Sequence, residues 1–365
     1  MIETVDQDLI HELRNQAENP PGADLVLGSF YQAIAEMVDN GNSIAILLQR
    51  IKQSRPDITT KHFVNLLYRS YQYIKLEEGK DLSFRAFDTA DKWHPELTRL
   101  LSDKQNREQL ETLLLARSTS TTVYQRYAGP YALISHTFDG IPISVTDLGC
   151  GGNYGLRGIE LQEPFKPICD QTPDKILSEL LLRRIYFEKG LAIDKEDPDD
   201  DAVTKWRLAC SFYPKELDEM TNVLAFEQRL KGSQRVQFLK TDLLTAEWLQ
   251  GGVFDVAILS TILYQLNPER QQRLIDKTKK LLKPEGILIV QDFAVKQLEN
   301  HQHLTFNESW SGREFGYRTF LTSALTRWNF QEVFQWMGGR CTTVRAGEDF
   351  NSVFSQAYAR TSTAA

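Results

Sequence analysis

The spacing of apolar residues in the first third of the chain predicts amphipathic helices. In residues 22–40, apolar side chains recur three or four positions apart, which places them on one face of a helix. The same spacing predicts helices over residues 43–54, 60–78 and 95–117. No motif with recognisable chemistry occurs in this part of the chain. We therefore expect an N-terminal all-α domain over residues 1–120.

After residue 120, short apolar segments alternate with amphipathic ones, and this pattern is typical of an α/β domain. A parallel sheet covered by helices produces such alternation, because each strand must be followed by a crossover helix. We expect this domain to span residues 121–365. The predicted strands cover residues 143–148, 190–194, 236–240, 254–260 and 286–292.

The C-terminal end of the chain has a different pattern. Two strand-like segments cover residues 341–346 and 352–360. A short polar turn, GEDFN, joins these two segments. The pattern therefore predicts an antiparallel hairpin that completes the sheet.

Composition and charge narrow the class of protein. The chain has 365 residues and a formal net charge of −7, which weighs against a nucleic-acid partner. No apolar stretch reaches the length of a membrane helix, and the acidic N-terminus MIETVDQDLI lacks the features of a signal peptide. The four cysteines are far apart and have no metal-ligand spacing. We expect a cytoplasmic protein with reduced thiols and no bound metal.

The segment from Ser144 to Gly155, SVTDLGCGGNYG, is the most informative motif. An apolar strand ends at Asp147, and three glycines then form a turn that lets a ligand approach the backbone closely. A dinucleotide-binding fold would have glycine at the sixth position of G-x-G-x-x-G, where this chain has Tyr154. No phosphate-binding P-loop sequence occurs. The motif therefore indicates a nucleotide-type ligand without a phosphate cradle.

This motif resembles the first motif of class I S-adenosylmethionine-dependent methyltransferases, an acidic residue followed by L-G-C-G-x-x-x-G. The resemblance covers residues 122–360 and implies a Rossmann-like, seven-stranded mixed sheet that binds S-adenosylmethionine. Residues near GLAIDKEDPDDD also resemble a bacterial group of methyltransferase-like proteins that have a helical N-terminal region. The matched residues of the first motif are Asp147, Gly149, Cys150, Gly151 and Gly155.

Later segments match the same family in the expected order, and residues 320–337 resemble the family's last helix. The resemblance implies that Asp194, at the end of the second strand, binds the ribose hydroxyls, with Asp170 as the alternative. It implies that Asp242 reads the adenine amino group and that Leu243 lies beside the ring. Ser260 and Tyr264, after the fourth strand, are expected near the cofactor. This strand lacks the D/N-P-P-Y/F signature of enzymes that methylate amino groups of bases, which further disfavours nucleic acid.

Candidate residues for the methyl acceptor lie before the first strand and after the fifth. A hydroxyl acceptor needs a base such as histidine, whereas a carboxylate is already ionised and needs only positioning. Arginine binds carboxylates through two parallel hydrogen bonds, and aromatic rings form pocket walls. The catalytic candidates are His301, His303 and Arg126. The candidates for the substrate pocket are Trp310, Arg313, Tyr317 and Arg318.

The sequence thus predicts an S-adenosylmethionine-dependent methyltransferase. The predicted acceptor is an oxygen on a small molecule or short peptide, with a carboxylate slightly favoured over a hydroxyl. The helical domain is expected to act as a lid or to select the substrate. Two alternatives stay open: a non-catalytic S-adenosylmethionine-binding partner or regulatory protein, and a dinucleotide-dependent oxidoreductase. The oligomeric state is not predicted.

Overall fold

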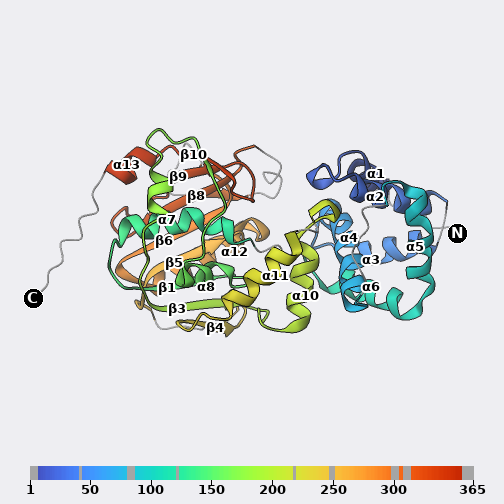
Figure 1. Ribbon diagram of the computed structural model, residues 1–365, viewed down its shortest axis with the longest axis horizontal. Coiled ribbons are helices and arrows are strands. Elements are labelled where there is room, and N and C mark those ends of the chain that lie inside the picture. The colour runs from blue at the N-terminus through green and yellow to red at the C-terminus, as the bar shows by residue number, and fades with distance from the viewer. Residues whose placement is uncertain are drawn as a thin grey trace, which may run out of the picture. The chain divides into compact units, whose positions relative to one another are not determined.

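The chain divides into two compact units. The first unit comprises Met1–Thr122 and Asp199–Phe226, and the second comprises Val123–Pro198 and Glu227–Ala365 (Figure 1). The sequence pattern placed one boundary near residue 120 but did not assign residues 199–226 to the helical unit. The computed structural model describes residues 7–40, 43–79, 87–120, 123–216, 219–245, 251–296, 304–306 and 314–355.

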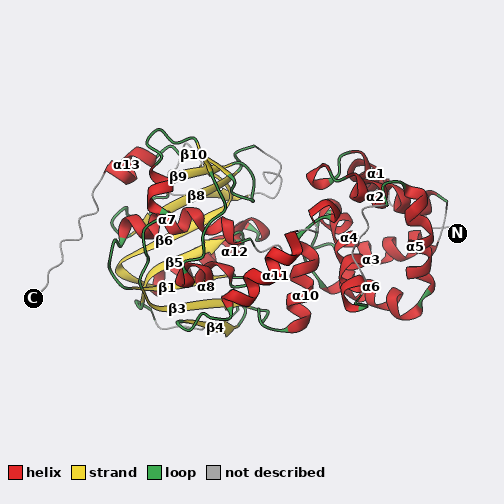
Figure 2. Ribbon diagram, viewed as in Figure 1, coloured by secondary structure: helices red, strands yellow, loops and turns green. Residues whose placement is uncertain are grey.

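The first unit is built from helices (Figure 2). Helix α2 begins where the Asp24 carboxylate accepts hydrogen bonds from the backbone N–H groups of Val26 and Leu27. Phe30 of this helix belongs to the hydrophobic core of the unit, and its ring centroid lies 5.1 Å from that of Trp93. Among the described residues, no helix is both long and apolar enough to span a bilayer. The helices are α1 (Gln7–Glu18), α2 (Leu25–Asp39), α3 (Ser43–Gln53), α4 (Thr60–Glu77), α5 (Ala90–Ser102), α6 (Lys104–Ala116) and α10 (Asp201–Ser211). Helix α11 (Glu219–Leu230) begins in this unit, and its last four residues belong to the second.

Helix α10 belongs to the helical unit because its apolar face and its C-terminal end are both buried there. Trp206 is 1% exposed, and its indole N–H donates to the Ser118 carbonyl at 2.9 Å. At the end of the helix, the buried Arg69 guanidinium donates to the Phe212 carbonyl at 2.5 Å, and the Gln72 amide donates to the Ala209 carbonyl at 3.0 Å. These donors satisfy carbonyls that have no partner within the helix, and a cation there also complements the helix dipole.

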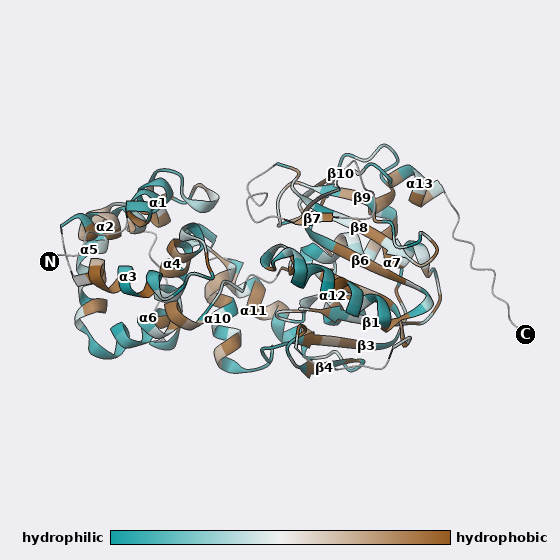
Figure 3. Cartoon of the chain, turned by 180° about the vertical axis from the view of Figure 1, so that it is seen from behind, coloured by the Kyte–Doolittle hydropathy of each residue, from teal (hydrophilic) through white to brown (hydrophobic). Residues whose placement is uncertain are grey.

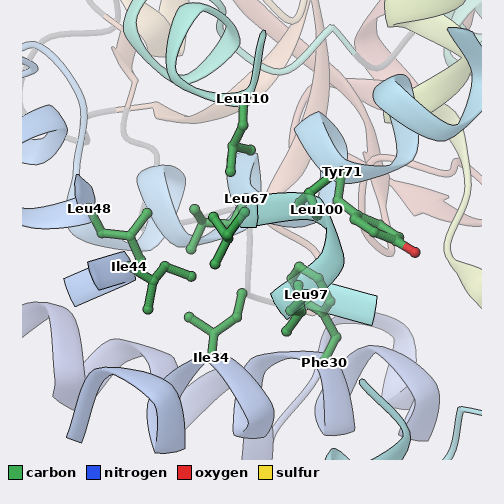
Figure 4. A pocket seen from close by; sticks show the side chains of 10 residues that line it. Phe30, Ile34, Ile44, Leu48, Leu67, Tyr71, Leu97, Leu100 and Leu110 are labelled. Atoms are coloured by element: carbon green, nitrogen blue, oxygen red, sulfur yellow. The ribbon is translucent and has the colours of Figure 1, made fainter. Parts of the chain in front are cut away.

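A small cavity lies between the helices of the first unit (Figure 4). Its volume is about 10 Å³, close to the space of one water molecule, and its walls are apolar, so we expect it to stay dry. The cavity is a packing defect and not a ligand site. Its lining residues are Phe30, Ile34, Ile44, Leu48, Leu67, Tyr71, Leu97, Leu100, Leu101 and Leu110.

Truncating Leu67 is expected to destabilise the helical unit, because the enlarged cavity would stay empty. Leu67 is 3% exposed and lines the existing cavity. We expect Leu67→Ala to lower the free energy of unfolding by about 2–5 kcal/mol, and Ile44→Val at the same cavity by only about 0.5–1.5 kcal/mol. Urea unfolding followed by far-ultraviolet circular dichroism measures both. Equal losses would mean that the cavity wall collapses around the smaller side chain.

The second unit contains a mostly parallel sheet, which confirms the predicted α/β class. Ten strands are described in it, in the order β2-β10-β9-β8-β6-β5-β1-β3-β4, with β7 paired to β6. The predicted number was seven. The strands are β1 (Ile143–Leu148), β2 (Cys169–Asp170), β3 (Phe187–Asp194), β4 (Val236–Lys240), β5 (Phe254–Ser260), β6 (Leu282–Lys296), β7 (Leu304–Phe306), β8 (Tyr317–Ser323), β9 (Gln331–Trp336) and β10 (Thr343–Ala346).

The second unit contains helices as well as the sheet. Strand β1 is buried along its whole length, as expected for a parallel strand covered on both faces. Helix α12 packs Leu274 and Ile275 into the core that contains β5 and β6, while much of its remaining surface is hydrophilic (Figure 3). The helices of this unit are α7 (Ala128–Thr137), α8 (Tyr154–Leu161), α9 (Ile176–Leu180), α12 (Pro268–Leu281) and α13 (Phe350–Ser355).

The order in which the chain adds strands to the sheet reverses between β1 and β5. From β1 the chain adds β3 and then β4 on one side, and it later adds β5 and β6 on the other side, all parallel to β1. In open α/β sheets, ligands bind outside the carboxyl ends of the strands at such a reversal. The glycine turn that follows β1 lies at this position.

The prediction for the C-terminal end was wrong in two respects. Residues 320–337 do not form a helix but contribute most of β8 and β9, an antiparallel pair. Residues 352–360 do not form a strand, because helix α13 includes residues 350–355, and the rest lie outside the described residues. Strand β8 is buried along most of its length, so its apolar residues do not alternate. A buried strand of this kind cannot be distinguished from a helix by periodicity alone.

Candidate ligand site at the carboxyl ends of the strands

The glycine turn joins β1 to helix α8 and is held by the neighbouring strand. The N–H groups of Gly149 and Cys150 both donate to the carbonyl of Ile193 on β3, at 2.8 and 3.2 Å. Gly149 and Gly151 have φ angles of 80° and 54°, which side-chain-bearing residues rarely adopt. A Cβ at Gly149 would lie 2.4 Å from Cδ1 of Ile262, in the loop after β5. Glycine at position 149 therefore lets the two loops at the strand reversal pack together.

Asp194 lies at the end of β3, next to the glycine turn. Its Oδ2 accepts a hydrogen bond from the Gly151 N–H at 2.8 Å, and its Oδ1 accepts one from the Glu196 N–H at 3.3 Å. Burial raises the pKa of this carboxyl, and the hydrogen bond from Gly151 opposes that effect. The alternative residue, Asp170, lies on β2 at the other end of the sheet order. The placement of β2 rules out Asp170 as a partner of the glycine turn.

Asp147 is completely buried at the end of β1. Its Oδ2 accepts a hydrogen bond from the Tyr127 hydroxyl at 2.8 Å, whereas its Oδ1 has no partner among the described residues. Burial raises the pKa of Asp147 to about 7; the Tyr127 hydrogen bond lowers it, and the negative charge of Asp194 adds to the rise. A buried carboxylate oxygen without a partner is costly, and a ligand that donates a hydrogen bond to it would remove that cost.

The raised pKa of Asp147 should make the free energy of unfolding depend on pH. Between its ordinary pKa of 3.8 and about 7, Asp147 binds a proton in the folded state more readily than in the unfolded state. Its contribution to stability is therefore present near pH 4 and lost as pH rises through 7, by at most about 1.4 kcal/mol per pH unit. Urea unfolding of the wild type and Asp147→Asn between about pH 5 and pH 7 measures the slope. Identical slopes for the two proteins would show that Asp147 titrates normally.

Tyr127 was missed by the sequence analysis, and its position explains Gly155. A Cβ at Gly155 would lie 2.1 Å from the Tyr127 ring, and one at Gly158 would lie 2.3 Å from the Tyr124 ring. Both tyrosines belong to a short 3-10 helix, Tyr124–Tyr127, before β1. Gly155, which was predicted to contact the cofactor, provides space for the tyrosine that holds Asp147. The pair of glycines three positions apart on one helix face was the signal for this packing.

The loop after β5 forms the other side of the strand reversal, and several contacts fix its conformation. Thr261 has φ of 59°, an unusual value for a β-branched residue, and its hydroxyl lies 2.6 Å from the Tyr317 hydroxyl. The buried Asp292 carboxylate accepts hydrogen bonds from the N–H groups of Ile262 and Leu263 at 3.0 and 2.8 Å. Nothing in the sequence pattern pointed to Asp292, which lies on β6, about thirty residues further along the chain.

The other predicted cofactor residues lie around these two loops. Cys150 is buried within the turn, and burial raises the pKa of its thiol. Ser260 is the last residue of β5, and its hydroxyl lies 3.4 Å from that of Thr261. Asp242 is exposed after β4, where its Oδ1 accepts from the Leu244 N–H at 2.7 Å. Leu243, beside it, is buried.

An aromatic cluster lies beside the β5 loop. The rings of Tyr264 and Phe293 are 5.4 Å apart, and those of Phe293 and Tyr317 are 4.9 Å apart. The Arg126 guanidinium donates through Nε to the Gly339 carbonyl at 2.9 Å. Its charge lowers the pKa of the Tyr317 phenol, against a larger rise caused by burial. The structure thus brings together Arg126, Tyr264 and Tyr317 of the predicted residues.

Arg318 is a correction to the predicted substrate pocket. It follows Tyr317 on β8, so its side chain projects from the opposite face of the sheet. Its guanidinium forms an ion pair of 2.5 Å with Glu332, which is fully buried on β9. An arginine paired in this way stabilises the strand pair and does not hold a substrate carboxylate. The remaining candidates, His301, His303, Trp310 and Arg313, lie outside the described residues.

Comparisons with known proteins return similarity only among solved structures. No family model and no curated protein matches the chain. The N-methyltransferase NodS of Bradyrhizobium japonicum is 14% identical and has a TM-score of 0.27, with 55% of this chain and 72% of that one covered. For the 1,6-didemethyltoxoflavin N1-methyltransferase of Burkholderia thailandensis the values are 18%, 0.26, 50% and 63%. For an O-methyltransferase family protein of the same species they are 15%, 0.28, 65% and 55%.

Two of these structures are named as N-methyltransferases and the third as an O-methyltransferase family protein. Their sequence identities to this chain and their TM-scores are low. They do not identify the reaction of this chain. A functional proposal therefore rests on the glycine turn, on Asp147 and Asp194, and on the order of the strands.

Proposed function

We propose that this chain is an S-adenosylmethionine-dependent methyltransferase that acts on an oxygen of a small molecule or short peptide. The observation that carries the proposal is the D-L-G-C-G turn at the strand reversal, with Asp194 of the adjacent strand bound to the Gly151 N–H. The groups around this turn are backbone amides, the buried carboxyl of Asp147 and the partly buried carboxyl of Asp194. Such a set suits a cationic ligand without phosphates and disfavours a dinucleotide.

The residues present fit S-adenosylmethionine. Asp147 offers a buried carboxylate oxygen without a described partner, which is a suitable acceptor for a ligand ammonium group. Asp194 would hold the ribose hydroxyls, Asp242 the adenine amino group, and Leu243 the face of the ring. When bound, this cofactor supplies an electrophilic methyl group on sulfur.

The protein's task in such a reaction is to align the acceptor and exclude water. Arg126 and the cluster of Tyr264, Phe293 and Tyr317 adjoin the loop after β5, and we propose that they form the acceptor side of the site. A carboxylate acceptor, slightly favoured over a hydroxyl, would need positioning by Arg126 and no base. The helical unit would select the substrate.

Calorimetric titration tests the proposal. We expect the full chain to bind S-adenosylhomocysteine and not NAD, and Gly151→Arg to abolish that binding because its side chain would fill the turn. Gly140→Arg is the matched control: Gly140 has a similar positive φ of 74°, but no atom lies within 4 Å of a Cβ placed there. Any strain from positive φ is common to both variants. Undiminished affinity in Gly151→Arg would show that the site lies elsewhere.

The acceptor requires a separate measurement. Metabolite extracts incubated with the protein and S-adenosylmethionine can be screened by mass spectrometry for products that have gained one methyl group. An oxygen ester would lose that methyl on mild base hydrolysis, whereas an N-methyl product would keep it. Binding of S-adenosylhomocysteine with no methylated product in any extract would favour the non-catalytic, cofactor-binding alternative.

A further inference from the structure

A chain of hydrogen bonds runs through buried side chains of β6, β8 and β9. The Trp336 indole N–H donates to the Thr319 hydroxyl at 2.8 Å, and that hydroxyl donates to Oε1 of Gln291 at 2.9 Å. Nε2 of Gln291 donates to the backbone carbonyl of Arg126 and also to the sulfur of Cys341, the latter at 3.6 Å. Gln291, Thr319, Trp336 and Cys341 are all 0% exposed. The chain therefore connects the interior of the sheet to the segment that precedes β1.

These polar side chains project from the same face of the sheet as the aromatic cluster. Gln291 of β6 is the cross-strand partner of Thr319 on β8. Two residues away along each strand, Phe293 and Tyr317 form another such pair. Side chains two positions apart on a strand point to the same face. The hydrogen-bond chain is thus the direct neighbour of the aromatic rings on the acceptor side of the proposed site.

Arg126 is fixed at both its backbone and its side chain. Its carbonyl accepts from Gln291, and its Nε donates to the Gly339 carbonyl at 2.9 Å. A Cβ at Gly339 would lie 3.4 Å from Nη2 of Arg126 and 3.4 Å from Cζ of Phe293. The guanidinium and the edge of the ring therefore face one common point, which the absence of a side chain at Gly339 keeps open.

The segment that carries Arg126 also packs tightly on the hydrogen-bond chain. A Cβ at Gly129, in the first turn of α7, would lie 2.5 Å from Oγ1 of Thr319 and 2.6 Å from Oε1 of Gln291. Apolar side chains of the same shape can replace a buried hydrogen-bonded pair at little cost in stability. The polar chain is therefore not needed to fill the core. What an apolar side chain cannot supply at position 291 is a hydrogen bond to the Arg126 carbonyl.

We propose that Gln291 is a positioning residue, which holds the Arg126 guanidinium in the place where a carboxylate acceptor binds. The inference rests on the proposed function, because that function assigns Arg126 to the acceptor side. Arginine binds a carboxylate through two parallel hydrogen bonds, so its orientation decides where the reacting oxygen lies. A displacement of about 1 Å in a group that orients a substrate can lower a rate by about 100-fold.

Nuclear magnetic resonance on the full chain tests this role without a known acceptor. In protein made with isotope-labelled arginine, the Nε–H signal of Arg126 is the one lost in Arg126→Lys. Gln291→Met keeps a similar side-chain length and removes the donor. We expect this variant to shift the Arg126 signal and to speed its exchange with water by about 10-fold, which corresponds to one lost hydrogen bond. With acetate as the probe carboxylate, the wild-type signal should move on titration, and Gln291→Met should need about 10-fold more acetate.

Thr322→Val is the matched control for a general loss of stability. Thr322 is 0% exposed on β8, and its hydroxyl lies 3.4 Å from that of Thr326. It lies three positions from Thr319, so its side chain projects from the opposite face of the sheet. We expect Thr322→Val to lower the unfolding temperature and to leave both the Arg126 signal and its response to acetate unchanged.

Each other outcome overturns a specific statement. If Gln291→Met has the wild-type Arg126 signal and acetate response, Gln291 only fills space, and the proposed function stands. If Thr322→Val changes the signal as much as Gln291→Met does, the effect is one of stability and not of positioning. If acetate does not move the wild-type signal, Arg126 is not a carboxylate site and the inference fails. Binding of S-adenosylhomocysteine to the same samples, measured by calorimetry, then decides separately whether the proposed cofactor site survives.

Discussion

Deleting residues 1–122 is expected to leave a polypeptide that does not fold to a soluble, monodisperse protein. The deletion removes the surface that covers helix α10, because Asp199–Phe226 belongs to the same compact unit. Trp206, Ala209 and Phe212 are each at most 2% exposed and belong to the core of the helical unit. Burying a large apolar side chain stabilises a protein by about 1.5–3 kcal/mol. Exposing several at once would cost an amount comparable to the whole stability of a domain, about 5–15 kcal/mol.

A second deletion provides the control. A variant that lacks residues 1–122 and also has residues 199–226 replaced by a short glycine-serine linker removes α10 together with its covering surface. We expect this variant to be more soluble than the simple deletion. Size-exclusion chromatography and thermal unfolding of both variants make the comparison. A simple deletion that elutes as a monomer and unfolds cooperatively would show that α10 does not depend on the N-terminal helices.

The placement of α10 shows where the sequence pattern stops being informative. Residues 201–211 have the composition of an ordinary crossover helix, and between two parallel strands such a helix is expected to cover the sheet. What decides its actual partner is the match with residues 69 and 72, far away in the sequence. Arg69 and Gln72 donate to carbonyls at its end. A long-range match of this kind leaves no periodic signal.

The central strands were predictable because each is a short apolar run with a clear polar boundary. Residues 143–148, 236–240 and 254–260 are strands with the expected limits. The glycine turn and Asp194 also lie where the motif implied, since carboxyl ends of parallel strands share one edge of the sheet. Tyr127 and Asp292 were missed because they act through tertiary contacts. Neither residue type nor local spacing distinguishes them from ordinary buried residues.

The largest effect of a single substitution is expected at Asp292. Besides Ile262 and Leu263, its carboxylate accepts from the N–H of Phe293 at 2.8 Å, and Asp292, Leu263 and Phe293 are all buried. Asp292→Ala leaves these N–H groups without an acceptor, at a cost of about 1–3 kcal/mol for each one that stays unsatisfied. We expect a loss of several kcal/mol in the free energy of unfolding, measured by urea denaturation.

The same substitution should impair the ligand site, because the loop held by Asp292 also positions the glycine turn. Ile262 contacts Gly149 at a point where no Cβ would fit, so a loop released from Asp292 no longer fixes that turn. Asp292→Asn keeps one carbonyl oxygen as an acceptor and nearly the same volume. It should lose less stability and retain more affinity for S-adenosylhomocysteine than Asp292→Ala. If Asp292→Ala unfolds at the wild-type urea concentration, other contacts hold the loop, such as the hydrogen bonds of Thr261 with the Gln291 carbonyl and the Tyr317 hydroxyl.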